Sequence, residues 1–189
     1  DHALAAFGLV PSGIALDLGA STGGFTEVLL ARGAAHVHAV DVGRGQLHPR
    51  LAADPRVTLH EGVNARAIPP GRVPEVDWIT ADLSFIGLET ALPGALGFAR
   101  PGASLVALVK PQFEVGRAHV GKGGIVADRS LGRAAAERIA DFLAARGWAP
   151  LGLAESPIPG GDGNREWLVA ATLDSRSDRR ETRPPGDTL

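Results

Sequence analysis

The sequence lacks cysteine and methionine, and it has few lysines. Without cysteine it can form neither a disulfide framework nor a thiolate metal site, which suits a reducing compartment. No apolar run reaches the length of a membrane span and no signal peptide opens the chain, so we expect a cytoplasmic protein without a membrane segment. The absence of an initiating methionine indicates a piece of a longer protein.

The sequence also lacks a large excess of positive or of negative charge. The formal net charge is −2 and the pI is about 6.3, whereas a nucleic-acid-binding surface usually has a basic face. If RNA is the partner, we expect another domain to supply much of the affinity. At 189 residues with 44% hydrophobic side chains, the chain is long enough for one domain with a substantial core.

Only two of the 19 Lys and Arg side chains are lysine, and both lie in one short segment, as Lys110 and Lys122. A sequence that uses arginine elsewhere for surface charge has kept lysine where an amine able to lose its proton is useful. Lys110 ends an apolar run and is the stronger candidate. Lys122 fits a solvated loop residue equally well.

What the sequence does contain is a glycine-rich turn between an apolar run and a predicted helix, in residues 14–25. Glycines allow a ligand to approach the backbone closely, and the first N–H groups of a helix attract negative charge. The pattern therefore predicts a strand, a tight turn and a helix N-terminus that bind a charged or strongly polar cofactor.

Three known motifs resemble this turn, and spacing argues against each. A dinucleotide fingerprint needs a second glycine where Ser21 stands, and a P-loop needs a lysine that the turn lacks. Residues 19–23 also spell the Gly-x-Ser-x-Gly nucleophile elbow, but an α/β-hydrolase needs earlier strands for its oxyanion hole. What remains is a cofactor held by the turn and by an acid further on. Asp41 closes the next apolar run, a position that suits a ribose diol.

Apolar runs alternate with helical patterns along the chain, which indicates an α/β fold with a mostly parallel, doubly wound sheet. The connection before the last strand is too short for a helical crossover, so that strand must run antiparallel. We expect residues 112–127 to form a long loop that acts as a mobile lid, and residues 174–189 to be disordered. The predicted strands are residues 14–18, 36–41, 57–60, 76–81, 104–109, 150–155 and 166–173. The predicted helices are residues 24–31, 44–53, 88–98 and 130–146, preceded by a helix end at residues 1–7.

Polar side chains collect where these strands end. Ligands of open α/β sheets bind beyond the carboxyl ends of the strands, near the switch in strand order. Glu166 opens the antiparallel strand and so reaches the same edge. The residues that follow the parallel strands are Gly19, Asp41, Asn64, Asp82 and Lys110. His36 and His38 alternate along one strand without a third metal-type partner nearby in sequence, so we expect no metal site.

Several longer stretches resemble one known family. They are Asp17-Leu-Gly-Ala-Ser-Thr-Gly-Gly-Phe-Thr26, Ala39-Val-Asp-Val-Gly-Arg-Gly-Gln-Leu47, Asp82-Leu-Ser-Phe-Ile86, Val109-Lys-Pro-Gln-Phe-Glu114 and Val120-Gly-Lys-Gly-Gly-Ile-Val126. Together they resemble the TlyA family, historically labelled haemolysin A, within the FtsJ-like RNA methyltransferases. The resemblance runs to about Leu173 and implies a Rossmann-like class I methyltransferase domain over residues 1–173. It implies 2′-O-methylation of cytidine in ribosomal RNA, with S-adenosyl-L-methionine as cofactor and rRNA or a ribosomal subunit as partner.

The resemblance also implies site residues. FtsJ-like enzymes use a Lys-Asp-Lys-Glu tetrad, of which Asp82, Lys110 and Glu166 match the last three members. The first lysine belongs to a segment before residue 1, behind an N-terminal S4 RNA-binding domain that this chain lacks. The cofactor-binding positions are Asp17, Gly19, Ala20, Ser21, Thr22, Gly23, Gly24, Phe25, Asp41, Val42 and Asn64, although Asn64 stands where FtsJ carries an acid.

The side chains agree with this chemistry. Methyl transfer from a sulfonium is an in-line displacement, for which the protein must align the acceptor oxygen and help to remove its proton. The Asp-Pro-Pro-Tyr type of motif used for exocyclic base amines is absent at Asp82-Leu-Ser-Phe, which favours a hydroxyl acceptor. Two alternatives stay open, an NAD-dependent oxidoreductase and a non-catalytic RNA-binding or haemolysin-type protein, although no basic amphipathic segment supports the latter.

Overall fold

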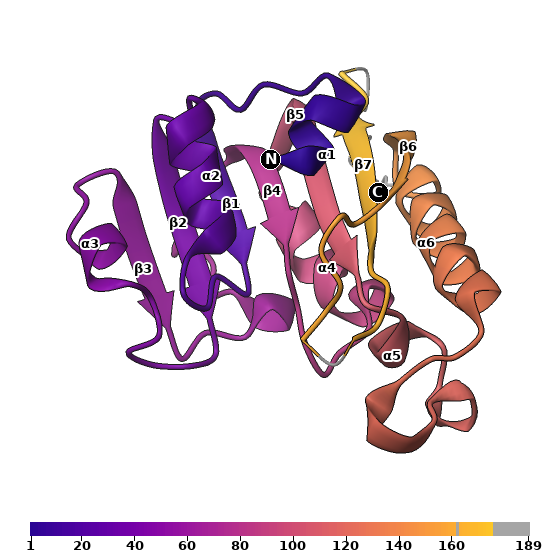
Figure 1. Cartoon of the computed structure of the whole chain (residues 1–189). Helices are drawn as coiled ribbons and strands as arrows, with labels where there is room; N and C mark the ends of the chain where they lie inside the picture. The colour runs from indigo at the N-terminus through magenta and orange to yellow at the C-terminus, as the bar shows by residue number, and fades with distance from the viewer. Residues whose placement is uncertain (162, 176–189) are drawn as a thin grey trace, which may run out of the picture.

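The computed structural model describes residues 1–161 and 163–175. These residues form one seven-stranded sheet in the order β3-β2-β1-β4-β5-β7-β6 (Figure 1). Most of the tail for which we predicted disorder, residues 176–189, lies outside the described residues. The strands are β1 (Ile14–Leu18), β2 (His36–Asp41), β3 (Val57–Glu61), β4 (Val76–Ala81), β5 (Ala99–Val109), β6 (Trp148–Glu155) and β7 (Trp167–Leu173). The helices are α1 (His2–Phe7), α2 (Gly24–Arg32), α3 (Pro49–Ala52), α4 (Leu88–Leu96), α5 (Pro111–Glu114) and α6 (Arg129–Ala144).

The first five strands pair in parallel, and β7 inserts antiparallel between β5 and β6. The predicted α/β class, the mostly parallel sheet and the antiparallel last strand are therefore confirmed. The chain winds outward from β1 in one direction and from β4 in the other, so the switch in strand order lies between these two strands. Ligands of open sheets bind in the crevice at such a point.

Helices cover both faces of the sheet and leave its carboxyl edge open (Figure 1). One core includes Leu16, Ile79 and Leu105 from the strands, packed with residues of α4 and α6. The opposite core includes Ala15 and Val106 with residues of α1, α2 and α3. Such two-sided burial explains why the strands are continuous apolar runs. Among the described residues, no helix has the length and apolar character needed to cross a membrane.

Some predicted segments differ from the structure. The helix expected over residues 44–53 is only the single turn α3, because Gly45 has φ +65° and Pro49 has no backbone N–H to donate inside a longer helix. The segment predicted as one long loop, residues 112–127, contains the end of α5 and two 3₁₀ turns, η2 (Arg117–His119) and η3 (Lys122–Gly124). Strand β5 also begins earlier than predicted, since Ala99 pairs with Val76 ahead of a register shift.

Candidate active site

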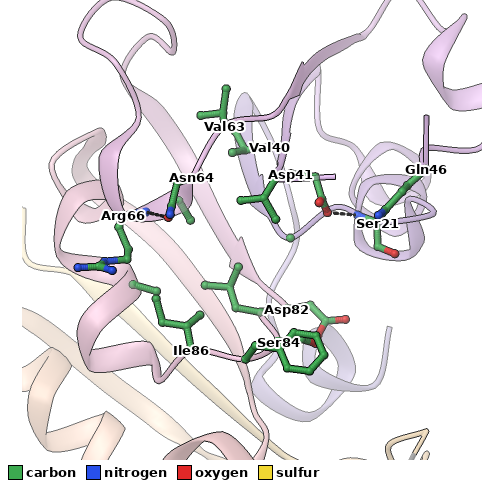
Figure 2. A pocket seen from close by; sticks show the side chains of 16 residues that line it. Ser21, Val40, Asp41, Gln46, Val63, Asn64, Arg66, Asp82, Ser84 and Ile86 are labelled. Atoms are coloured by element: carbon green, nitrogen blue, oxygen red, sulfur yellow. Dashed lines mark hydrogen bonds between the residues drawn. The ribbon is translucent and has the colours of Figure 1, made fainter. Parts of the chain in front are cut away.

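A cavity of about 510 Å³ lies at the switch point, between the loops that follow β1, β2, β3 and β4. Figure 2 shows Asp41 and Ser21 on one side of it, Asn64 and Arg66 on another, and Asp82 and Ser84 on a third. Of the predicted cofactor residues, the cavity is lined by Gly19, Ser21, Asp41, Val42 and Asn64. It is also lined by Asp82, so predicted cofactor and catalytic residues share one space.

The glycine turn approaches β4 so closely that one position excludes a side chain. Gly19 has φ +77°, and a Cβ there would overlap the backbone carbonyl of Asp82. Ser21 also has a positive φ of +47°, which is uncommon for a residue other than glycine and is found at functional sites. The turn is therefore held in a conformation that the rest of the site imposes.

Asp41 organises the side of the cavity formed by the glycine turn. Its carboxylate accepts hydrogen bonds from the backbone N–H groups of Ser21, at 2.8 Å, and Gly43, at 2.7 Å. A carboxylate has about four acceptor positions, so two remain for a ligand hydroxyl pair. Asp41 thus shapes the turn and can bind a ribose diol at the same time.

Asn64 follows β3 at the other side of the cavity. Its Oδ1 accepts a hydrogen bond from the backbone N–H of Arg66, at 3.0 Å, and caps the 3₁₀ turn η1 (Ala65–Ala67). The amide Nδ2 is the donor left to a ligand. An acid at this position would accept where Asn64 can donate.

Asp17, for which we predicted a cofactor contact, is not among the residues that line the cavity. It is fully buried, and its two carboxylate oxygens accept hydrogen bonds from Thr26 Oγ1 of α2, at 2.7 Å, and Thr80 Oγ1 of β4, at 2.9 Å. Burial raises the pKa of Asp17 to about 6, against the lowering effect of the threonine hydrogen bonds. Asp17 therefore links β1 to α2 and to β4.

The remaining turn residues also lie outside the cavity lining. Gly23 has φ +103° and is packed so closely against Leu47 and Leu51 that a Cβ would overlap both side chains. Ala20 is buried, and Phe25 faces a small apolar space beside Thr80 and Val106. Thr22 and Gly24 are exposed. Packing against these leucines is one reason for a glycine at position 23, and the sequence pattern alone could not distinguish it from ligand binding.

Lys110 and Asp82 meet at the ends of β5 and β4. Lys110 Nζ lies 2.6 Å from Asp82 Oδ1 and donates a hydrogen bond to Ser84 Oγ at 3.1 Å. The contact with Asp82 has the length of a charge-assisted hydrogen bond but not its angles. The buried Oδ1 of Asp82 therefore makes an ion pair with Lys110 and accepts no hydrogen bond of good geometry. The Lys110 side chain is only 15% exposed, so its amine is held beside the cavity and not in open solvent.

Glu166 lies one residue before β7, at the edge of the sheet where β5 ends. Val109 pairs with Trp167, so the next position along brings Glu166 opposite Lys110. Glu166 is buried, and its carboxylate packs against Gly160 in the connection between β6 and β7. The structure thus brings Asp82 and Lys110 into contact and places Glu166 at the same edge.

Several residues of the site were not predicted from the sequence. Phe85 is 90% exposed with φ +67°, and its ring centroid lies 5.2 Å from that of Phe113. An exposed aromatic ring in a turn with positive φ at a cavity rim is an unusual combination. The sequence could not reveal it, because the backbone conformation and the exposure are known only from the structure. The other unpredicted lining residues are Val40, Gln46, Val63, Ala65, Arg66, Leu83, Ser84, Ile86 and Ala91.

These features fit S-adenosyl-L-methionine. The cavity has the volume of a small-molecule site. Gly19 removes the Cβ that would close the gap between the turn and Asp82, Asp41 offers acceptors to a diol, and apolar Val42, Val63 and Ile86 supply walls for a heterocycle.

The strand order, the antiparallel β7 and a cavity at the β1/β4 switch define a class I methyltransferase fold. The N-methyltransferase NodS from Bradyrhizobium japonicum WM9, in complex with S-adenosyl-L-homocysteine, shares this fold. Its TM-score is 0.60 at 15% identity, over 90% of this chain and 81% of that one.

The chain belongs to the FtsJ-like methyltransferase family, which matches residues 1–173. It is 50% identical, over 88% of its length, to the 16S/23S rRNA (cytidine-2′-O)-methyltransferase TlyA of Mycobacterium tuberculosis. It covers 63% of that relative. A solved structure from Streptococcus thermophilus, described as a hemolysin, has a TM-score of 0.86 at 41% identity, over 92% of this chain and 64% of that one.

Proposed function

We propose that this domain transfers a methyl group from S-adenosyl-L-methionine to the ribose 2′-hydroxyl of cytidine in ribosomal RNA. The observation that carries the proposal is the Lys110–Asp82 pair, at 2.6 Å, beside the cavity that we assign to the cofactor. The similarity to the rRNA (cytidine-2′-O)-methyltransferase of Mycobacterium tuberculosis supports the choice of substrate. We therefore propose that the protein works in the cytoplasm.

We assign the acceptor chemistry to Lys110, Asp82 and Glu166. The bound cofactor supplies an electrophilic methyl group. Lys110 Nζ, when neutral, takes the proton from the acceptor hydroxyl, while Asp82 Oδ1 and Ser84 Oγ fix the position of the amine. Glu166, next in the register, orients the ribose or the amine.

Lysine acts as a base only in its neutral form, and an acidic neighbour favours the charged form whereas a nearby cation favours the neutral one. We therefore propose that an upstream lysine completes the site. We also propose that residues 1–173 form the methyltransferase domain and that an S4-type RNA-binding domain precedes it in the full-length protein. The chain's coverage of only 63% of the relative's length is consistent with this organisation.

The exposed ring of Phe85 belongs to the acceptor side. Single-stranded RNA bases are commonly held by stacking on aromatic rings. Phe85 lines the same cavity as Asp82 and Ser84, so a base whose ribose reaches Lys110 can stack there.

The deciding experiment is transfer of a radiolabelled methyl group to purified ribosomal subunits by the full-length protein, followed by mapping of the modified nucleotide. We expect label on a cytidine 2′-oxygen. Label on a base nitrogen or carbon would refute the acceptor assignment. Tight NADH binding without binding of S-adenosyl-L-methionine would favour an oxidoreductase.

RNA affinity tests the domain organisation. The net charge of −2 provides little attraction for phosphates, which dominate affinity for nucleic acids. We expect residues 1–189 alone to bind rRNA much more weakly than the full-length protein in a filter-binding titration at moderate salt. Equal affinity of the two proteins would contradict the proposal that another domain supplies much of the RNA binding.

A further inference from the structure

Glu114 is a nearly buried carboxylate that is not among the proposed catalytic or cofactor-binding residues. Its side chain is 4% exposed, and burial raises its pKa above the ordinary range. Oε1 accepts a hydrogen bond from the backbone N–H of Leu88 at 2.8 Å, and Oε2 lies 3.2 Å from Arg138 Nη2 of α6. A buried charge is costly unless it is paired, so its partners indicate what it holds together.

The bond to Leu88 caps a helix from a distance. Leu88 is the first residue of α4, and the N-cap residue Gly87 has no side chain to bind the unpaired N–H groups. A helix N-terminus attracts negative charge, and a side-chain oxygen normally satisfies one of its donors. Here Glu114, from α5, supplies the oxygen that the local sequence lacks.

This contact joins the two loops that carry the proposed catalytic pair. Asp82 begins the connection from β4 to α4, and Lys110 is the N-cap residue of α5. The two loops contact each other at three points along their length. The contacts are Lys110 Nζ with Asp82 and Ser84, the ring of Phe113 with that of Phe85, and Glu114 Oε1 with Leu88 N.

Arg138 of α6 also holds the Glu114 carboxylate in place. It donates a hydrogen bond from Nη2 to the backbone carbonyl of Glu114 at 3.0 Å, and its Nε lies 3.5 Å from Glu89 of α4. Figure 1 places α5 near the beginning of α6. Glu114 is therefore held between α4 and α6 and cannot shift without breaking bonds to both helices.

We propose that Glu114 is a positioning residue, whose bond to the start of α4 fixes Lys110 against Asp82. Its use in methyl transfer rests on the proposed function, whereas the coupling between the loops does not. Loss of the bond frees the α5 turn at one end, and misplacement of a reacting group by about 1 Å can reduce a rate on the order of 10²-fold.

Three substitutions separate position from charge. Glu114→Gln keeps an oxygen for Leu88 N–H, Glu114→Asp keeps the charge on a side chain too short to reach it, and Glu114→Ala removes both. Glu137→Gln is the matched control, because Glu137 is an exposed α6 residue paired with Arg133. We expect kcat on ribosomal subunits to fall about tenfold or more in Ala, less in Asp and least in Gln, with KM and cofactor affinity within about twofold of wild type.

The rarity of lysine allows a readout that does not need activity. Because Lys110 and Lys122 are the only lysines in residues 1–189, ¹³C-lysine labelling of this chain gives two side-chain Cε signals in the NMR spectrum. We expect the Lys110 signal to shift and to show greater motion in Glu114→Asp and, where it folds, Glu114→Ala. The Lys122 signal should stay unchanged, as should both signals in Glu137→Gln.

The outcomes separate the inference from the proposed function. A folded Glu114→Asp protein with an unchanged Lys110 signal and unchanged kcat would overturn the inference and leave only a stabilising role. A Lys110 signal that responds in residues 1–189, together with a full-length wild type that transfers no methyl group, would support the coupling and refute the proposed function.

Discussion

The two ends of the cavity are built in different ways. At the cofactor end, Asp41 and the glycine turn are joined by hydrogen bonds to backbone N–H groups. At the proposed acceptor end, Asp82 and Lys110 come from two strand ends and are in contact, while Glu166 lies at the same edge, one residue before β7. The hydrogen bonds between Asp41 and the backbone of the turn are local, so we expect substitutions elsewhere to disturb them little. The proposed acceptor end depends instead on every element that sets the spacing of β4, β5 and β7.

Asp17 connects these two ends. Its hydrogen bonds to Thr26 of α2 and Thr80 of β4 link the helix after the glycine turn to the strand that precedes Asp82. Damage to the acceptor end should therefore reduce turnover and spare cofactor binding, while changes at Asp17 should affect the stability of the whole sheet edge. Five measurements test this division.

The largest effect is expected for Lys110→Arg in the full-length protein. Arginine keeps the positive charge beside Asp82 but cannot give up its proton at working pH. We expect methyl transfer to fall by about 10² or more, the usual contribution of a general base, while calorimetric affinity for S-adenosyl-L-methionine stays within about twofold. Lys122→Arg is the control. Near-normal turnover of Lys110→Arg would show that Lys110 is only an ion-pair partner.

Asp17→Asn tests the buried link through the pH dependence of unfolding. The pKa of Asp17 is raised from 3.8 to about 6, so its contribution to stability is complete below pH 3.8 and is lost as pH rises through 6. Two pKa units correspond to about 3 kcal/mol. We expect the wild-type free energy of unfolding to lose about this amount, relative to the variant, between pH 4 and 7.

The comparison between the two proteins is needed because His38, whose pKa burial lowers to about 4, titrates in the same range. Chemical denaturation at several pH values supplies the free energies. Parallel pH profiles for wild type and Asp17→Asn would mean that Asp17 is ionised in the folded protein without a penalty.

Asp41→Asn weakens the cofactor end. A hydrogen bond to a charged group contributes about 1.5–3 kcal/mol, so we expect affinity for S-adenosyl-L-methionine to fall about 10- to 100-fold. The Lys110–Asp82 contact should be unaffected because it lies across the cavity. Calorimetry with the cofactor, its demethylated product and NADH measures this directly; unchanged affinity for the first two would remove Asp41 from the site.

Phe85→Asn should separate function from stability. Asparagine tolerates the positive φ of +67°, and the Phe85 ring is 90% exposed, so we expect unfolding free energy to change by about 1 kcal/mol or less. Loss of base stacking, worth about 1–3 kcal/mol, should reduce methyl transfer about tenfold. Val10→Asn, at another exposed apolar residue, is the control, and equal effects of the two variants would argue against a substrate contact.

The smallest effect concerns the predicted lid. Buried Asn164 accepts a hydrogen bond from Val126 N–H at 2.9 Å and donates one to the Gly124 carbonyl at 2.8 Å. We expect rapid hydrogen exchange at residues 116–120 and slower exchange at Val126, with Asn164→Ala accelerating Val126 about tenfold. Exchange in α6 should not change. Strong protection throughout residues 112–127 would contradict a mobile lid.

The sequence by itself determined the parts of the fold that depend on local pattern. The bounds of β1, β2 and β4 follow from apolar runs that end at glycine or aspartate, and the antiparallel β7 follows from a connection too short for a crossover. Asp41 could be placed near the glycine turn for the same reason, because parallel strands end at one edge.

Only the tertiary structure decided what these residues touch. No spacing rule separates a buried Asp17 bonded to two threonines from an aspartate that lines the cavity. Likewise, Glu114 caps α4 although it follows β5, a contact that sequence periodicity does not encode. Local sequence sets backbone conformation through steric and hydrogen-bonding preferences, but the burial and partners of a side chain depend on elements that meet only when the sheet is complete.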